Sequence, residues 1–318
     1  MDRGQRRQLA GILLSLSWVG LAAFQGVYAG NIVQGIDPIV LLVACASVTA
    51  LVTNALQLRE HTRYGQLIRR NARLVVSINL LTAGAWATAF ACLRFIEPTA
   101  AETFTFAVTP IATLLSAIAM RRAVGWLASE LIASIVMVLA GAGLGVAIFR
   151  GASSVGQIAF ASAVAGISMA AASGLFGGVM ISYLKQLSDV GFTVSQTMAA
   201  RFLFVIPAGI VYCVATGHSA GPVLAQAGGV VLLTGLGMIL PAYVSQLGIE
   251  RTEPTTAALI GALTPAATFA MQQADGRLTF SPTSMIAALA IVVALAWSSV
   301  ARVRATAPEA AGPELAGP

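Results

Sequence analysis

The sequence predicts an all-α integral membrane protein with ten transmembrane helices, arranged as two inverted five-helix repeats. Three observations lead to this prediction. Of the 318 residues, 58% are hydrophobic and only 9% are charged, whereas soluble domains carry about 25% charged residues. Ten apolar segments have about the 20 residues that a helix needs to cross a bilayer. A short proline motif also occurs twice, about half a chain apart.

The ten predicted spans are 9–29, 38–58, 74–95, 98–120, 127–149, 158–183, 192–215, 229–248, 254–273 and 283–301. The first span follows an arginine-rich start and could instead be a cleaved signal peptide, but its apolar run is longer than a typical signal sequence has. Residues 1–150 form the first repeat and residues 155–304 the second. The tail 305–318 has no apolar period, so we expect it to be disordered and cytoplasmic.

The repeated motif pairs Glu-Pro-Thr with a later Thr-Pro. Its copies run from Glu97 to Pro110 and from Glu253 to Pro265, offset by 156 residues at the glutamate and 155 at the second proline. Proline within a helix frees the carbonyl four residues earlier and bends the helix. Because about 12 residues of helix rise roughly 18 Å, Pro110 and Pro265 would lie near the middle of the bilayer. Broken helices at matching places in two halves are typical of transporter sites, so we expect both prolines to act as hinges or to border a substrate cavity.

Positive charges orient the predicted spans. With the N-terminus inside, 14 of the 17 Lys and Arg residues in loops and tails fall on the cytoplasmic face, and only Arg94, Arg150 and Arg277 fall outside. This bias fits an even number of spans with both termini cytoplasmic in the inner (plasma) membrane. Five spans per half then make the second half enter from the opposite side, so the repeats are inverted. Since orientation explains the basic charge, no nucleic-acid partner is expected.

Two stretches carry a family resemblance: 94–122, RFIEPTAAETFTFAVTPIATLLSAIAMRR, and 248–278, GIERTEPTTAALIGALTPAATFAMQQADGRL. The chain resembles the EamA-type branch of the drug/metabolite transporter superfamily over roughly residues 9–304. The resemblance implies ten helices in inverted repeats, an inner-membrane location and alternating access, but no particular substrate. The chain departs from the family pattern after the fourth span, where Arg121-Arg122 is followed by no acidic residue. The second span, around Ala46, also lacks the arginine that Arg201 supplies in the seventh.

Arg201 and Glu102 are ionisable residues within predicted spans, and such residues are functional candidates by default. Arg201 could bind a carboxylate or a phosphate. The interpretation that we favour is structural: an arginine that snorkels to the inner surface or ties helices together through backbone carbonyls. Glu102 could exchange a proton, the candidate coupling ion. Its favoured alternative is a first-turn carboxylate held by the helix dipole at the outer surface.

A substrate cavity is predicted from two helix faces. Asn79, Thr82 and Trp86 are spaced to share one face of the third span, and Tyr243 and Gln246 share a face of the eighth. Together they would give aromatic walls with a few polar groups that orient a small molecule. Hydrogen bonds between helices and aromatic residues at the membrane interface are the alternative interpretation.

Other features narrow the classes of function. Gly166, Ala170, Gly174 and Gly178 form a row of small residues that lets another helix approach closely. We interpret the row as internal packing, and a homodimer contact stays open. The three cysteines lie in apolar segments and both histidines in loops, so no metal, cofactor or catalytic arrangement is expected.

The sequence therefore predicts a secondary transporter that exports a small organic metabolite, amino-acid-like or drug-like, by alternating access. No P-loop is present, so ATP would not drive it directly. An importer of a small metabolite and a membrane-embedded protein without transport activity stay open as alternatives. An enzyme is not expected, because no His, Asp or Cys residues gather near one membrane face.

Overall fold

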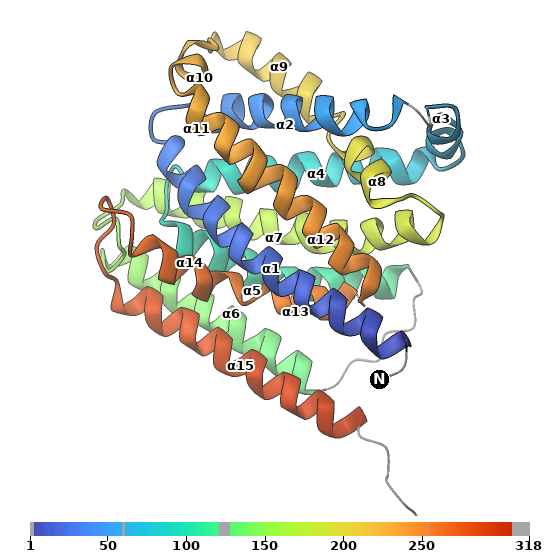
Figure 1. Ribbon diagram of the computed structural model, residues 1–318. Helices are drawn as coiled ribbons and strands as arrows, with labels where there is room; N and C mark the ends of the chain where they lie inside the picture. Colours follow the sequence, from blue (N-terminus) through green and yellow to red (C-terminus); the bar gives the residue numbers. More distant parts are fainter. Residues whose placement is uncertain (1–2, 59–60, 121–127, 253, 307–318) are drawn as a thin grey trace, which may run out of the picture.

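The computed structural model describes residues 3–58, 61–120, 128–252 and 254–306, which fold into helices with no strand among them (Figure 1). The helices of the first half are α1 (Arg3–Ile32), α2 (Pro38–Ala55), α3 (His61–Arg70), α4 (Ala72–Cys92), α5 (Pro98–Ala119) and α6 (Ala128–Phe149). The helices of the second half are α7 (Phe160–Asp189), α8 (Val194–Arg201), α9 (Val205–Thr216), α10 (Gly221–Ala225), α11 (Ala227–Leu232), α12 (Leu240–Arg251), α13 (Pro254–Gly261), α14 (Thr264–Gln272) and α15 (Pro282–Thr306). Glu253, Arg121, Arg122 and most of the predicted tail lie outside the described residues.

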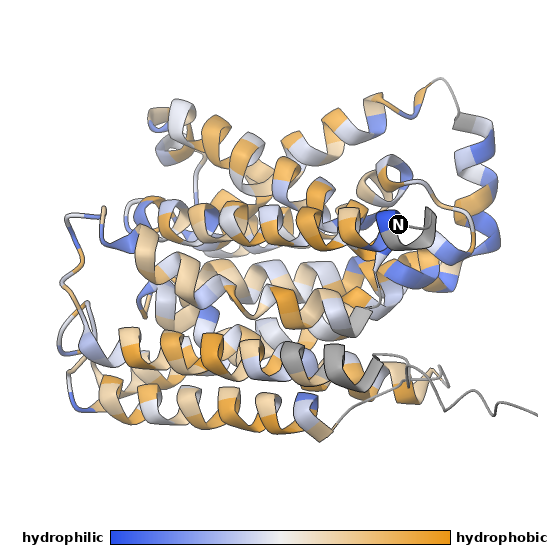
Figure 2. Cartoon of the chain, turned by 60° about the horizontal axis from the view of Figure 1, so that its bottom comes forward, coloured by the Kyte–Doolittle hydropathy of each residue, from blue (hydrophilic) through white to orange (hydrophobic). Residues whose placement is uncertain are grey.

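The distribution of apolar side chains is that of a helical membrane protein. Within the described ranges, eight helical segments are long and apolar enough, by length and composition, to cross a membrane. Large apolar side chains face outward, as at Leu51 (73% exposed) and Val214 (78% exposed), while polar ones such as Thr82 and Gln246 are fully buried. Figure 2 shows hydrophobic residues along the helices and hydrophilic residues mainly toward their ends. The chain is therefore an all-helical, multi-pass membrane protein.

Three of the predicted spans are interrupted. The span 192–215 is divided by a turn at residues 202–204 between α8 and α9. The span 254–273 is divided between α13 and α14, just before Pro265. The span 229–248 contains a stretch of π-helix, Leu233–Ile239, between α11 and α12. All three interruptions lie in the second half, whereas α5 runs without a break through Pro110.

Helix α3 was missed by the sequence analysis, which treated residues 59–73 as a basic loop. Tyr64, Leu67 and Ile68 are spaced at i, i+3 and i+4, and they pack onto a buried cluster that includes Val75 and Leu187. With four basic or imidazole side chains in its ten residues, α3 is too short and too polar to register as a span. It is an amphipathic helix that covers one end of the bundle.

The helices have two common ends. At the end that holds Gly151, the loop after α1 meets the loop after α4, because the Arg94 guanidinium donates a hydrogen bond of 2.8 Å to the Val33 carbonyl. At the end that holds α3, the start of α1 meets the end of α12, where Gly11 lies against Thr252. We refer to these as the Gly151 end and the α3 end.

The row of small residues on α7 packs against α5. Thr105, Thr109 and Thr113 on α5 donate side-chain hydrogen bonds to the carbonyls of Ala170, Gly174 and Gly178, at 3.1, 3.3 and 3.1 Å. A Cβ atom on Gly174 would lie only 2.1 Å from the Thr105 carbonyl oxygen, so only glycine allows this approach. The contact joins one helix from each half of the chain and forms one wall of the central cavity.

Candidate functional site

A central cavity of about 170 Å³ lies among α1, α4, α5, α7, α8, α12 and α13. It is lined mainly by apolar and aromatic side chains, including Trp18, Trp86, Phe90 and Phe106. At roughly 30 Å³ of liquid per water molecule, this is the space of a small organic molecule. Helices of both halves contribute to its walls, so the cavity depends on the packing of one half on the other.

Arg201, at the end of α8, is the basic residue of this cavity. Its side chain is only 2% exposed, and its one described hydrogen bond runs from Nη2 to the Met180 sulfur, at 3.4 Å. No acceptor among the described residues meets Nε or Nη1. The guanidinium carbon lies 5.2 Å from the centre of the Phe202 ring. The Arg201 side chain is therefore buried and lines the cavity, and no backbone carbonyl among the described residues accepts a hydrogen bond from it.

Glu102 is the acidic residue of the same cavity and lies in the second turn of α5, against Gly26 of α1. No hydrogen bond or ion pair to it is found in the described part of the chain, and Arg201 lies at a different depth. The threonine hydrogen bonds join residues of α5 to residues 65 positions later in α7. By the same register, Glu102 on α5 lies at the same depth as residue 167 on α7. Met180, which contacts Arg201, is 13 residues later on α7, and so lies roughly 20 Å further along its axis. The two charges thus lie toward opposite ends of the cavity and do not neutralise each other directly.

Of the five residues predicted to line a substrate cavity, Trp86 lines the central cavity. Its ring lies 6.0 Å from those of Phe90 and Phe202. Tyr243 is 42% exposed and is absent from the lining of the central cavity. Gln246 is fully buried outside the lining, and neither of its amide atoms has a described partner.

Asn79 and Thr82 hold helices together instead of lining the central cavity. The Asn79 side-chain amide donates to the Ala200 carbonyl at 2.6 Å, and its oxygen accepts a hydrogen bond from the Phe204 backbone N–H at 3.0 Å. Asn79 therefore satisfies backbone groups on both sides of the turn between α8 and α9, and so holds in place the turn that follows Arg201. The Thr82 hydroxyl lies 3.5 Å from the Met180 sulfur, which also contacts Arg201.

The paired prolines occupy different settings. Pro110 is buried within α5, next to the cavity-lining residue Thr109. Pro265 lies in the first turn of α14, and the Thr264 hydroxyl donates a hydrogen bond of 2.6 Å to the carbonyl of Gly261, four residues before the proline. The second copy of the motif thus breaks its helix, while the first leaves its helix continuous.

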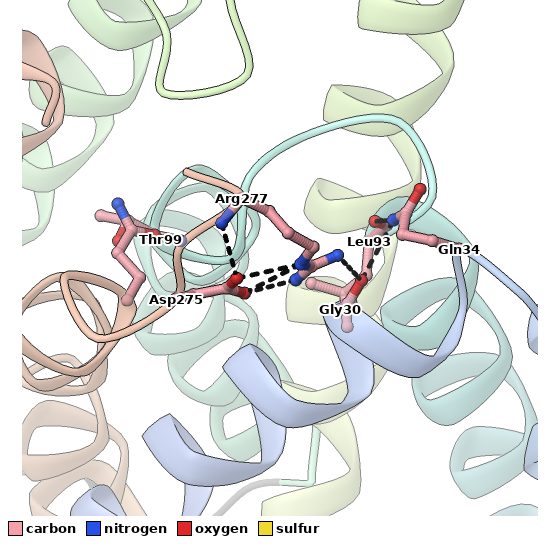
Figure 3. A network of polar contacts seen from close by, with 7 residues as sticks. Gly30, Gln34, Leu93, Thr99, Asp275 and Arg277 are labelled. Atoms are coloured by element: carbon pink, nitrogen blue, oxygen red, sulfur yellow. Dashed lines mark hydrogen bonds and ion pairs between the residues drawn. The ribbon is translucent and has the colours of Figure 1, made fainter. Parts of the chain in front are cut away.

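Polar contacts that the sequence analysis missed join the helices at the Gly151 end (Figure 3). The Gly30 carbonyl accepts hydrogen bonds from Gln34 and from Arg277, both at 3.1 Å, and Gln34 also donates to the Leu93 carbonyl at 3.2 Å. Arg277 is paired in turn with Asp275. Hydrogen bonds from Arg277 hold the pKa of Asp275 below its usual value, and burial of the carboxylate opposes them.

A second buried cluster at the same end surrounds Glu97, the first residue of the proline motif. Its carboxylate accepts hydrogen bonds from the Ser154 backbone N–H and the Ser284 hydroxyl. Gln272 accepts from the Thr99 backbone N–H at 3.2 Å. Glu97 therefore connects the start of α5 with the loop between the halves and with α15.

Further lining residues come from α1. Ser15, Trp18, Ala22 and Gln25 recur at three- or four-residue intervals and face the cavity as one stripe. This spacing is visible in the sequence and could have identified α1 as a cavity wall. Among the described residues, no group of three or more His, Cys, Asp or Glu side chains could hold a metal ion.

Comparison with known proteins gives information about the fold. No protein-family model and no curated protein matches the chain. A solved crystal structure, described only as that of a protein, matches with a TM-score of 0.66 and 18% sequence identity, covering 95% of this chain and 99% of the other. At this level of identity, the likeness shows that the two chains share a fold over nearly their whole length.

Proposed function

We propose that this chain is a secondary transporter that exports a small organic molecule by alternating access through the central cavity. The observation that carries the proposal is the cavity itself, which lies between the two halves and holds a buried arginine and a glutamate without direct mutual pairing. Ionisable side chains in the interior of a membrane protein are costly, and they mark substrate or ion pathways. We assign the chain to the EamA-type transporters of the drug/metabolite superfamily as part of this proposal.

The proposed architecture is ten spans in two inverted repeats, with α13 and α14 together as the ninth span and α15 as the tenth. Reciprocal packing supports it. Helix α1 packs on α12, α13 and α14, and α7 packs on α4 and α5, so the first helix of each half meets the third and fourth of the other. The fifth helices, α6 and α15, also pack on each other. A two-fold relation between the halves would produce such matching pairs.

We propose that the α3 end faces the cytoplasm of an inner membrane. Arg63, Arg69, Arg70 and Arg73 belong to α3 and the start of α4, in keeping with the excess of basic residues in cytoplasmic loops. The Gly151 end would then face outward, and the Gly30–Gln34–Arg277 contacts would hold that end closed in one state of the cycle. Glu102, toward the outward end of the cavity, is the proposed proton-exchanging group.

Two matched glycines allow a test of the cavity. A Cβ atom on Gly177 or on Gly143 would meet no other atom within 4 Å, but Gly177 lines the cavity while Gly143 lies on the exposed face of α6. Gly177→Phe should fill the cavity, and Gly143→Phe should add the same side chain to the outer surface. Both variants are compared with the unmodified chain in cells that otherwise lack it, at equal membrane amounts.

The readout is the small-molecule content of cells and medium. Export predicts compounds that accumulate in the medium with the unmodified chain and with Gly143→Phe, and that stay in the cells with Gly177→Phe. Accumulation inside the cells would reverse the assigned direction. Equal profiles for Gly177→Phe and the unmodified chain would show that the cavity is not the transport route.

A further inference from the structure

We infer that the molecule taken up by the central cavity is an organic carboxylate whose anionic group binds Arg201. The inference rests on the proposed function and deepens it, because it names the chemical class of the ligand. It starts from the state of the guanidinium, which is 2% exposed and lines the cavity.

The hydrogen-bonding capacity of Arg201 is largely unused. Nε and Nη1 have no acceptor among the described residues, and together they carry three of the five N–H donors of a guanidinium. The one partner of the side chain, the sulfur of Met180, is a weak acceptor. Buried donors without acceptors are costly and buried charges are normally paired, so a ligand that supplies both an acceptor and a negative charge completes this site.

Among the residues that the structure describes, no acidic side chain of the protein lies beside Arg201. Glu102 is the one acidic residue in the described lining of the cavity, and it lies toward the Gly151 end while Arg201 contacts Met180 toward the α3 end. Glu250 of α12 follows the lining residue Ile249 but does not itself line the cavity. Its charge interacts instead with those of Arg251, Lys185 and Arg7. An anion at Arg201 would therefore be held by a single positive charge.

The rest of the lining favours a carboxylate over a phosphate ester. A doubly charged phosphate would leave charge unmatched, since one cation faces it and the cavity already holds a carboxylate. A carboxylate matches the guanidinium in charge and accepts two hydrogen bonds in one plane. Trp86, Phe90 and Met180 of the same lining provide an apolar wall for the body of the molecule. The fitting ligand is thus a small monocarboxylate with an apolar or aromatic body.

The test uses matched pairs of ligands on the purified full-length chain. The probes are monocarboxylates from butyrate to 3-phenylpropionate and 3-(indol-3-yl)propionate, each with its primary amide, which keeps the shape and removes the charge. Binding is measured by calorimetry or by ligand-dependent thermal stabilisation. The unmodified chain should bind at least one carboxylate about tenfold or more tightly than its amide, the size of effect expected for hydrogen bonds to a charged group.

The variants are Arg201→Gln, Arg201→Lys and, as control, Arg150→Gln, which removes an exposed arginine outside the cavity. Arg201→Gln should abolish the preference for the carboxylate, Arg201→Lys should retain part of it, and Arg150→Gln should keep it. Binding of none of the carboxylates by the unmodified chain, or equal binding of acids and amides, would overturn the inference even if Arg201→Gln failed to fold.

Transport is measured separately in proteoliposomes, so that the two proposals fail in different ways. Binding of a carboxylate through Arg201 without any uptake would contradict the transport proposal and support the binding site. Uptake of acids and amides at equal rates, unchanged in Arg201→Gln, would support transport and rule out Arg201 as the anion site.

Discussion

The carbonyl oxygen of Thr105 lies where the side chain of residue 174 would begin: a Cβ atom on Gly174 would be 2.1 Å from it. The same part of α7 accepts the hydrogen bonds of Thr105 and Thr109. Close packing and hydrogen bonding are thus combined in one contact, and each depends on the other.

Gly174→Ala should destabilise the protein, because the added methyl group meets backbone atoms that cannot move aside independently of α5. Overpacking of this kind costs about 1–3 kcal/mol. Gly177 is next to the contact residue Gly178, but a Cβ atom on Gly177 would meet no other atom within 4 Å. Gly177→Ala should therefore not destabilise the protein. Thermal denaturation of both variants in detergent measures the difference. Equal melting temperatures would show that the contact between α5 and α7 is looser than described.

Asn79→Leu should also destabilise the protein, because it leaves the Ala200 carbonyl and the Phe204 N–H without their side-chain partner. Each buried polar group left unsatisfied costs about 1–3 kcal/mol. Asn31→Leu, at an exposed position of α1, is the matched control. The melting temperature and the level of folded protein report the effect. An Asn79→Leu protein as stable as the control would mean that the turn after α8 is held by other contacts.

Reporter fusions test the proposed topology. A fusion after residue 35 ends in the loop between α1 and α2, and a fusion after residue 318 ends at the C-terminus. With ten spans and both termini inside, the two reporters lie on opposite sides of the membrane. A reporter active only outside the cytoplasm, and another active only inside, give the readout. Finding both fusion points on the same side would exclude the ten-span arrangement.

Pro110→Ala and Pro265→Ala test the hinge hypothesis. Each restores a helix hydrogen-bond donor and should stiffen its span, so substrate binding should survive while turnover falls. Accessibility of engineered cysteines should show one access state over-populated. Because Pro265 lies in the first turn of α14, next to the break after α13, whereas α5 is continuous through Pro110, the larger effect is expected for Pro265→Ala. Transport at the unmodified rate by both variants would rule out a hinge at either proline.

The Asp275–Arg277 pair gives a pH-dependent contribution to stability. The folded-state pKa of Asp275 is lowered from 3.8, chiefly by hydrogen bonds from Arg277, so the stabilisation is fully present above about pH 4 and is lost as the pH falls through the lowered pKa. Arg277→Gln should reduce the melting temperature at pH 7, and its difference from the unmodified chain should shrink below pH 4. A difference that stays constant down to pH 3 would show that Arg277 stabilises the loop independently of Asp275.

Most of the helices could be predicted because the length of each apolar segment can be read from the sequence alone. The breaks at residues 202–204 and 262–263 could not, because the side chains that compensate for the first one, such as Asn79, are distant in sequence. Helix α3 was missed because its signal is the spacing of Tyr64, Leu67 and Ile68 and not its length.

For the candidate site, residue type identified Arg201, Glu102 and Trp86 but did not give their orientation. Burial of a polar residue in a helix bundle fits both a cavity and a contact between helices. Asn79 shows the difficulty, because its amide bonds the backbone across a contact between helices. The packing of α7 and α8 was needed to show that Nε and Nη1 of Arg201 have no acceptor within the described part of the chain.

Helix α5 belongs to the first half of the chain and α7 to the second, yet their contact is among the closest in the molecule. The two halves, which we propose to be repeats, are therefore not mechanically independent units. In the proposed transport cycle, any rigid body that moves must include helices from both halves, and a fragment ending near Gly151 would expose the threonine face of α5 to lipid. We therefore expect each half to need the other in order to fold.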